Sequence, residues 1–221
     1  MASSSVATSL STTDENPDIL GNFDLDIDDI IDLSSVLVRV DEEVTENHPK
    51  SALGTRYWHE CVAVLREKLL ARGWQLEDAH NQPRVALEYG NGAKLTLIAC
   101  GGDVNTGTNK MPKTRNSKGS QTQAAVNSNA YQHSLELENT LPSVSASQET
   151  FEGCWFFLVY HDSSLNEIRM EISKPLEFSL GRITNWSNRI ILPSVKLDNY
   201  SVNEDDFDAS PDIDIPIVPK G

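Results

Sequence analysis

Cysteine is scarce in this chain, and the spacings that would bind a metal are missing. The three cysteines, Cys61, Cys100 and Cys154, are far apart and odd in number. No Cys-x-x-Cys motif occurs, and no cysteine–histidine pair has the spacing of a zinc site. We therefore expect buried free thiols, as is usual in a reducing cytosol.

Long apolar runs are also absent. The longest, "CWFFLVY" (Cys154–Tyr160), has seven residues, whereas a membrane-spanning helix needs about 20. Its length is typical of a buried strand. The first residues, "MASSSVATSLSTTDE", lack the basic and apolar regions of a signal peptide and the arginines of a transit peptide. These features predict a cytoplasmic protein with no membrane partner.

Motifs for nucleophilic catalysis and for nucleotide hydrolysis are lacking as well. No histidine accompanies a Gly-x-Ser-x-Gly turn or a cysteine elbow. Gly102 and Gly107 have the glycine spacing of a Walker loop, but Thr108-Asn109 follows where that motif requires Lys-Ser/Thr. The sequence therefore assigns no catalytic residue, metal ligand or cofactor.

Two groups of acids leave a metal-dependent enzyme open as an alternative. On a strand, Asp24 and Asp26 of "FDLDIDD" would project to one side, where they could hold Mg²⁺ for phosphoryl or nucleotidyl transfer. Asp162 and Glu171 could serve a nuclease, but Lys174 would lie on the opposite strand face from Glu171. The simpler interpretations are a solvated acidic segment at 23–29 and a half-buried strand around Glu171.

What the chain does contain is a strong and uneven negative charge. The formal net charge of the 221 residues is −15. Residues 1–50 hold 12 acids and 2 bases, residues 197–221 hold 7 acids and 1 base, and residues 51–196 hold 14 acids and 15 bases. Because the terminal acids have few large apolar neighbours, disorder is expected there. The predicted division is a largely disordered acidic arm over 1–34, a domain over 35–199 and an acidic tail over 200–221.

The middle region shows the patterns of an α+β domain. Apolar residues at helical spacing, with Ser51 as N-cap and Gly73 beyond the end, predict the main helix over 51–72. A weaker helix is expected over 122–138. Residues 36–40 are typical of a strand, and residues 182–189 of a short helical turn.

Two hairpins are predicted from turn signals between alternating runs. Asn91-Gly92, within 84–100, favours a type I′ turn. The second hairpin has its turn at Asp162-Ser163-Ser164. Consecutive hairpins favour an antiparallel sheet, so the expected fold is α+β, with a sheet of hairpins packed on one main helix.

The exception to the acidic character is the stretch "GGDVNTGTNKMPKTRNSKGSQ" (Gly101–Gln121). It carries four bases against one acid, and its glycines allow backbone N–H groups to approach a ligand closely. Such a loop can hold phosphate oxygens or a nucleic-acid backbone. Two other interpretations of the loop stay open. It could be a solvated insertion, or it could be a docking site for an acidic segment, including the protein's own arms. The four bases are Lys110, Lys113, Arg115 and Lys118.

A second candidate lies in "GRITNWSNRI", where Trp186 stands between Arg182 and Arg189. On a helix these three side chains could share one face, and an aromatic ring flanked by cations can stack on a base. The alternative is a core tryptophan with two arginines paired to acids.

Together these features predict a non-catalytic binding or accessory protein. Its basic loop would contact a phosphate-bearing ligand, polyphosphate or nucleic acid, and its acidic arms would bind protein partners. A metal-dependent nuclease or phosphoryl-transfer enzyme is the first alternative. An acidic mimic of nucleic acid is the second.

Overall fold

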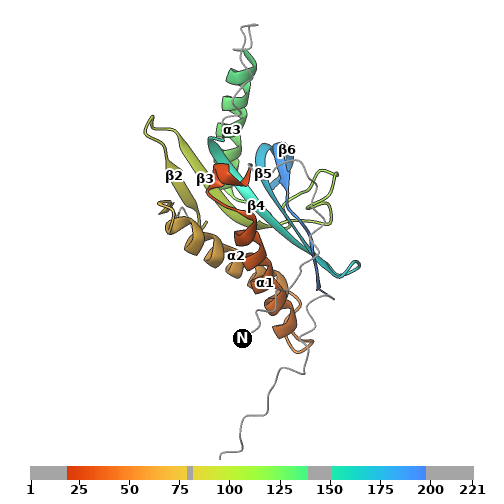
Figure 1. Ribbon diagram of the computed structural model, residues 1–221. Helices are drawn as coiled ribbons and strands as arrows, with labels where there is room; N and C mark the ends of the chain where they lie inside the picture. Colours follow the sequence, from red (N-terminus) through yellow and green to blue (C-terminus); the bar gives the residue numbers. More distant parts are fainter. Residues whose placement is uncertain (1–18, 79–81, 139–150, 198–221) are drawn as a thin grey trace, which may run out of the picture.

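The computed structural model describes residues 19–78, 82–138 and 151–197, without the side chains of 135–138. Within these ranges the chain has mixed α+β content, with three α-helices and a mostly antiparallel sheet of seven strands (Figure 1). The predicted fold class is confirmed in this coarse form. The elements are η1 (Leu20–Phe23), α1 (Ile27–Glu43), α2 (Ala52–Leu70), β1 (Gln75–Leu76), β2 (Val85–Glu88), β3 (Lys94–Gly101), α3 (Ser120–Glu138), β4 (Gly153–Asp162), β5 (Glu167–Ser179), β6 (Arg182–Ile191) and β7 (Val195–Lys196).

The sheet has the strand order β1-β2-β3-β4-β5-β6, and β7 pairs with β5. Neighbouring strands are antiparallel except β3 and β4, which run parallel. A parallel pair needs a crossover connection, and the loop 102–119 together with α3 supplies it. The basic stretch therefore begins where β3 ends, beside the carboxyl half of β4.

Both predicted hairpins are present, as β2–β3 and β4–β5. The predicted type I′ turn at Asn91-Gly92 is wrong, because only Gly92 has a positive φ there (83°) and the loop spans three residues. Two consecutive residues with positive φ, as a type I′ turn requires, occur instead at Leu180 (50°) and Gly181 (76°). They join β5 to β6, so the predicted helical turn over 182–189 is also wrong.

The N-terminal acidic segment folds further into the domain than its composition predicts. Residues 27–43 form α1, so the strand predicted at 36–40 is wrong. The arm boundary predicted at residue 34 falls inside this helix and is wrong as well. The acidic residues outside the described ranges are those of 1–18 and 198–221, together with Glu149.

The acids of "FDLDIDD" stabilise this helix and its partner. Asp26 caps α1 in a capping box, in which Asp26 and Asp29 each accept the other's backbone N–H. Asp24 accepts a hydrogen bond from the indole N–H of Trp74 at 2.8 Å. Asp24 and Asp26 therefore do not project from one face of a strand, which was the geometry that the metal interpretation required.

An ion pair joins α1 to the end of α2. The guanidinium of Arg72 contacts the buried Asp29 carboxylate at 2.5 Å. Burial raises the pKa of Asp29, but the hydrogen bond from Arg72 and the backbone N–H of Asp26 outweigh it, so the pKa lies below its usual value. The Asp29 carboxylate therefore stays ionised at neutral pH and holds the two helices together.

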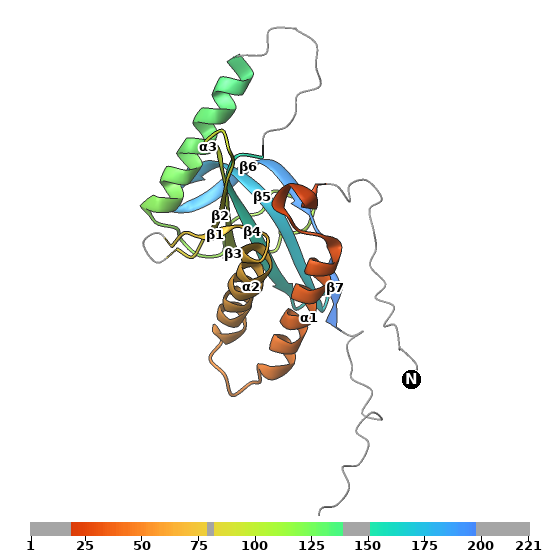
Figure 2. The ribbon, with the colours of Figure 1, turned by 60° about the vertical axis from the view of Figure 1, so that its left-hand side comes forward.

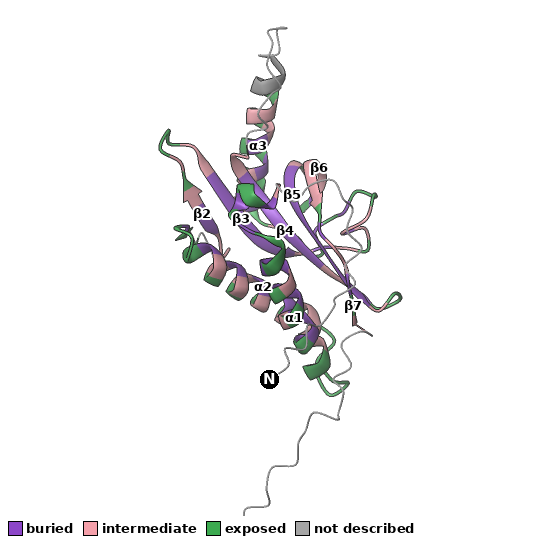
Figure 3. Cartoon of the chain, in the orientation of Figure 1, coloured by how far each residue is buried: buried purple, intermediate pink, exposed green. Residues whose placement is uncertain are grey.

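Helices α1 and α2 cover one face of the sheet, and α3 lies on the other side (Figure 2). The sequence predicted α2 and α3 but only one packing helix. The burial pattern follows these layers, with purple on the central strands and on the inner sides of α1 and α2 (Figure 3). No helix in the described part of the chain has the length and apolarity to cross a membrane.

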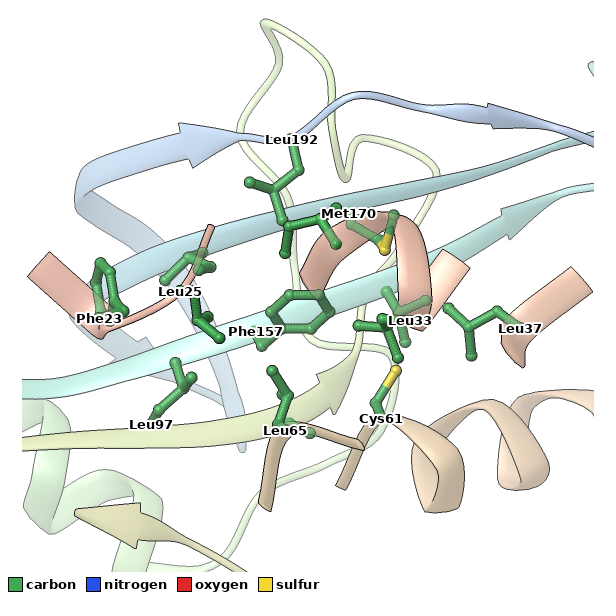
Figure 4. Packing of buried hydrophobic residues seen from close by; sticks show 14 of the residues in the cluster. Phe23, Leu25, Leu33, Leu37, Cys61, Leu65, Leu97, Phe157, Met170 and Leu192 are labelled. Carbon is green, nitrogen blue, oxygen red and sulfur yellow. The ribbon is translucent and has the colours of Figure 1, made fainter. Parts of the chain in front are cut away.

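The main core lies between the helix pair and the sheet. Phe157 of β4 lies at its centre, between Leu25 and Leu33, with Leu65 of α2 below it in the view of Figure 4. All four side chains are at most 4% exposed. Strand β4 is thus buried as its apolar composition predicts, and the three free cysteines are buried too.

Trp155→Ala is expected to destabilise the protein more than Trp58→Ala. Trp155 is 2% exposed, and its ring lies 5.1 Å from that of Phe23 and 5.5 Å from that of Phe151. Its removal should lower the free energy of unfolding by about 3–5 kcal/mol. Trp58 is only partly buried, so its removal should cost clearly less. Urea unfolding of both variants measures the difference, and equal losses would contradict the packing described above.

A smaller core lies on the opposite face, under α3. Val126 of α3 packs there against Phe156 and Trp186. The buried side chain of Asn129 holds α3 in place, since its amide donates to the carbonyls of Cys154 and Pro175 and accepts from the Cys154 N–H. The first half of α3 is therefore fixed, while its second half extends past the sheet (Figure 1).

Candidate anion-binding cleft

The basic loop is anchored to the sheet rather than solvated along its length. Its backbone binds the end of β3 through Arg115 N–H to Gly101 O (2.8 Å) and the β5–β6 turn through Lys118 N–H to Gly181 O (2.7 Å). Thr106 and Thr114 are fully buried. The interpretation of this stretch as a solvated insertion is therefore wrong for its backbone.

Glu171 of β5 is the main anchor of the loop. Its carboxylate is fully buried and accepts from the Gly107 N–H at 2.8 Å and the Ser173 hydroxyl at 2.7 Å. The Arg189 guanidinium pairs with it at 2.5 Å and also donates to the Thr108 carbonyl at 2.9 Å. The half-buried strand predicted here is wrong, because the loop covers the polar face and both faces are buried.

Because they lie on a strand and not on a helix, Trp186, Arg189 and Arg182 do not form one binding face. Trp186 is 3% exposed in the smaller core, and its indole donates to the Pro112 carbonyl at 2.8 Å. Arg189 is paired with Glu171. Arg182 is exposed and reaches the Thr114 carbonyl at 3.5 Å. Trp186 and Arg189 thus fasten the loop, as the core alternative anticipated, and only Arg182 faces open space.

Beside the anchored loop lies a cleft of about 1190 Å³. One wall is the first half of α2, another is the carboxyl half of β3, and a third is formed by both ends of the loop with the start of α3. The end of β4, Arg182 and the segment Gln82–Pro83 also line it. The cleft thus lies outside the carboxyl ends of the parallel pair β3–β4, which is where ligands bind in open α/β sheets.

The charged residues of the cleft are nearly all basic. Lys50, Arg115, Lys118 and Arg182 line it, with Asp103 as the one acid of the lining. The Asp103 carboxylate already accepts the Asn105 N–H at 3.1 Å. In a chain with a net charge of −15, this concentration of positive charge favours an anionic ligand.

The four cleft cations differ from most other cations of the described ranges in their ion pairing. In the described ranges, no salt bridge involves any of the four cleft cations. Outside the cleft and the loop, most lysines and arginines of the same ranges are paired with carboxylates. The paired ones are Arg56, Arg66, Lys68, Arg72, Lys94, Arg169, Arg189 and Lys196. Within the described ranges, most of the cations without a carboxylate partner therefore lie at the cleft and the adjoining loop.

Arg115 lies against the first turn of α2. A Cβ built on Gly54 would come within 2.7 Å of its guanidinium nitrogen, so the absence of a side chain at Gly54 makes room for it. The Arg115 side chain has no hydrogen bond or ion pair with any residue that the structure describes. Ser51 likewise makes no capping hydrogen bond with the described residues. Two positive features, a guanidinium and a helix N-terminus, thus meet here. Among the described residues no carboxylate faces them, and the Ala52 N–H is bonded to the Pro49 carbonyl at 2.8 Å.

Lys118 connects the cleft to the buried thiol of Cys100. Burial raises the pKa of this thiol, and the nearby Lys118 ammonium lowers it by less, so the pKa stays above its usual value. Cys100 is 1% exposed. It is therefore a neutral thiol in the floor of the cleft, and not an activated nucleophile.

The remaining wall contributes aromatic and polar groups. The indole N–H of Trp58 donates to the Ala99 carbonyl at 3.1 Å. His161 lies across from it, with its Nε2 3.6 Å from the Asp41 carboxylate, which also accepts from the Tyr57 hydroxyl at 3.3 Å. This Asp41 contact links α1, α2 and β4 at one end of the cleft.

Of the seven binding residues predicted from the sequence, the structure brings Arg115, Lys118 and Arg182 to the cleft. Lys110 and Lys113 are exposed on the loop outside it. The sequence missed Lys50 and the first turn of α2. One signal could have revealed that turn, since Ser51, Gly54 and Trp58 are spaced to share one helical face.

The acids of the enzymatic alternative are not brought together. Glu171 pairs with Leu158 of β4, four residues before Asp162, which places the backbone positions of the two acids about 13 Å apart along the strands. Asp162 binds Ser164 at its own turn and pairs with Arg169. Among the described residues, no group of three His, Cys, Asp or Glu side chains is arranged to hold a metal ion.

Comparison with known proteins does not assign a function to the cleft. No protein-family model, no curated protein and no solved structure matches this chain. Its function is therefore argued from the charge, the shape and the internal contacts of the cleft.

Proposed function

We propose that this chain is a non-catalytic binding protein of the cytoplasm whose cleft holds a phosphate-bearing ligand. The observation that carries the proposal is the cluster of cations around Arg115 and the N-terminus of α2, which form no salt bridge with the residues that the structure describes. Phosphate oxygens accept hydrogen bonds from guanidinium groups and from helix N-termini alike. One phosphate group bound beside both features would interact favourably with each of them.

The charge of the whole chain favours a small ligand over a nucleic acid. A small phosphate ester can stay within the cationic cleft, whereas a polymer would extend over a surface that carries the net charge of −15. Like charges repel one another over a screening length of roughly 8 Å at physiological salt. The ends of a bound polymer would therefore meet unfavourable potential.

The acidic segments complete the proposal. Residues 198–221 hold seven acids and one base, and residues 1–18 are acidic too. Such segments suit the binding of basic protein surfaces. They also provide an internal competitor for the cleft, since β7 ends beside the β4–β5 turn, where His161 and Ser163 line the cleft.

Replacing Arg115 and Lys118 with glutamine is expected to weaken pyrophosphate binding at least tenfold. Each substitution removes a charge-assisted hydrogen bond worth about 1.5–3 kcal/mol. The matched control replaces Lys110 and Lys113, which lie on the same loop but outside the cleft. Isothermal titration calorimetry of the full chain at two salt concentrations measures both affinities. The wild-type protein and the control should bind alike.

Three outcomes of this titration would overturn the proposal. The first is no pyrophosphate binding by the wild-type protein at low salt. The second is an equal loss in both double variants, since this would show a diffuse effect of loop charge. The third is binding of a single-stranded oligonucleotide more tightly than pyrophosphate, with a steep salt dependence, which would favour nucleic acid.

A further inference from the structure

The cleft face of α2 carries both a phosphate-binding end and an aromatic ring. Gly54 and Trp58 are four residues apart on one face of the helix, and both line the cleft. Four residues rise about 6 Å along a helix. Since Arg115 lies against Gly54, its guanidinium and the indole are about one helical turn apart.

The ring of Trp58 is held in the wall and is not free to turn. Its N–H donates to the carbonyl of Ala99 in β3, and the side chain is partly buried. The His59 ring approaches it from the exposed side of α2, with 5.0 Å between ring centroids. A fixed, partly exposed indole at the edge of a cleft can receive a flat ring of a ligand by stacking.

The size and polar groups of the cleft exceed the needs of a bare phosphate. Its volume of about 1190 Å³ is above the usual range of about 300–1,000 Å³ for small-molecule sites. The Gln82 amide is held in place, because it donates to the Thr122 hydroxyl at 3.2 Å and accepts from Arg84 at 2.6 Å. Asn116 and Gln121 add further donors and acceptors to the lining.

We infer that the phosphate-bearing ligand is a nucleotide, whose phosphate lies at Arg115 and the α2 N-terminus and whose base stacks on Trp58. This inference rests on the proposed function. The pentose of a nucleotide separates a 5′-phosphate from its base by a span comparable to the one helical turn between Gly54 and Trp58. Stacking suits any base, because every base has a π-face. The polar groups of the same lining can bind the base edge or the sugar hydroxyls.

The test compares adenosine 5′-monophosphate with ribose 5-phosphate, which has the same phosphate and sugar without the base. Calorimetry of the full chain is expected to show adenosine 5′-monophosphate binding about tenfold more tightly, as one stacked base provides. Trp58→Leu should abolish this advantage and leave the affinity for ribose 5-phosphate unchanged. Trp58→Phe, which keeps an aromatic ring, should retain part of the advantage and controls for loss of the indole hydrogen bond.

The outcomes separate the inference from the proposed function. Equal affinity of the wild-type protein for the two ligands would overturn the inference that the ligand is a nucleotide, but would leave the proposed phosphate site in place. An advantage for the nucleotide that survives in Trp58→Leu would place the base elsewhere and overturn the stacking. Failure to bind either ligand would overturn the proposed function together with the inference. A cooperative thermal transition well above the titration temperature in both variants confirms that the comparison concerns folded protein.

Discussion

Deleting residues 1–34 is expected to unfold the domain. The deletion removes η1 and the first half of α1, and with them five apolar side chains that are at most 7% exposed. They are Leu20, Phe23, Leu25, Ile30 and Leu33. Each such side chain contributes about 1.5–3 kcal/mol by burial, so their sum is comparable to the whole net stability of a typical domain, about 5–15 kcal/mol.

Circular dichroism during heating measures this effect. A chain of residues 35–221 should show no cooperative transition, whereas a chain of residues 19–221, which keeps η1 and all of α1, should melt as the full chain does. The acidic composition of the segment predicts the opposite for 35–221. A cooperative transition in that chain near the midpoint of the full protein would show that η1 and the start of α1 are dispensable.

Glu171→Ala is expected to cost about 3–5 kcal/mol of unfolding free energy, because it leaves the Arg189 charge without its buried partner. It also removes the acceptor for the Gly107 N–H. The loop should detach, so trypsin should cleave at Lys110 and Lys113 faster than in the wild-type protein. Because Arg115 and Lys118 are positioned by the same loop, pyrophosphate binding should weaken too.

Glu177→Ala is the matched control, since Glu177 is an exposed glutamate on the same strand. It should change the urea midpoint and the trypsin rate little. Similar effects of the two substitutions would mean that the loop does not depend on the buried ion pair. Mass spectrometry of the early tryptic fragments identifies which bonds are cut.

The elements that the sequence predicts well are those with local signals. Helix α2 follows from its apolar spacing and its end at Gly73, and the β2–β3 hairpin from the turn around Gly92. Each pattern lies within a short window and does not depend on distant residues. The apolar run of β4 is likewise a local signal. It predicts a strand that is buried on both faces, whichever elements cover those faces.

The sequence does not predict helix α1, because the residue pattern at its start is also typical of a strand. In "FDLDIDD" acids and aliphatics alternate with period 2, which is typical of a strand. The structure uses the same acids to cap the helix and to bind Arg72 and Trp74, 43 to 50 residues further along the chain. Long-range partners of this kind leave no local signal.

The candidate site was predicted in part for the same reason. The charge of the loop is visible in the sequence, but whether each cation is paired is decided by the fold. Arg189 lies 18 residues from Glu171 and is neutralised by it, whereas Arg115 meets the backbone of Gly54 across the cleft. Lys50 and Arg182 join Arg115 only because the β3–α3 crossover brings three distant segments together.

The most direct test of the central claim is a titration of ¹⁵N-labelled full-length protein with pyrophosphate, followed by amide NMR shifts. The account predicts saturable shifts at residues 52–55 of α2 and 115–119 of the loop, with little change at 108–113. Shifts centred on 108–113, or small shifts spread over the surface without saturation, would contradict the assignment of the cleft as an anion site.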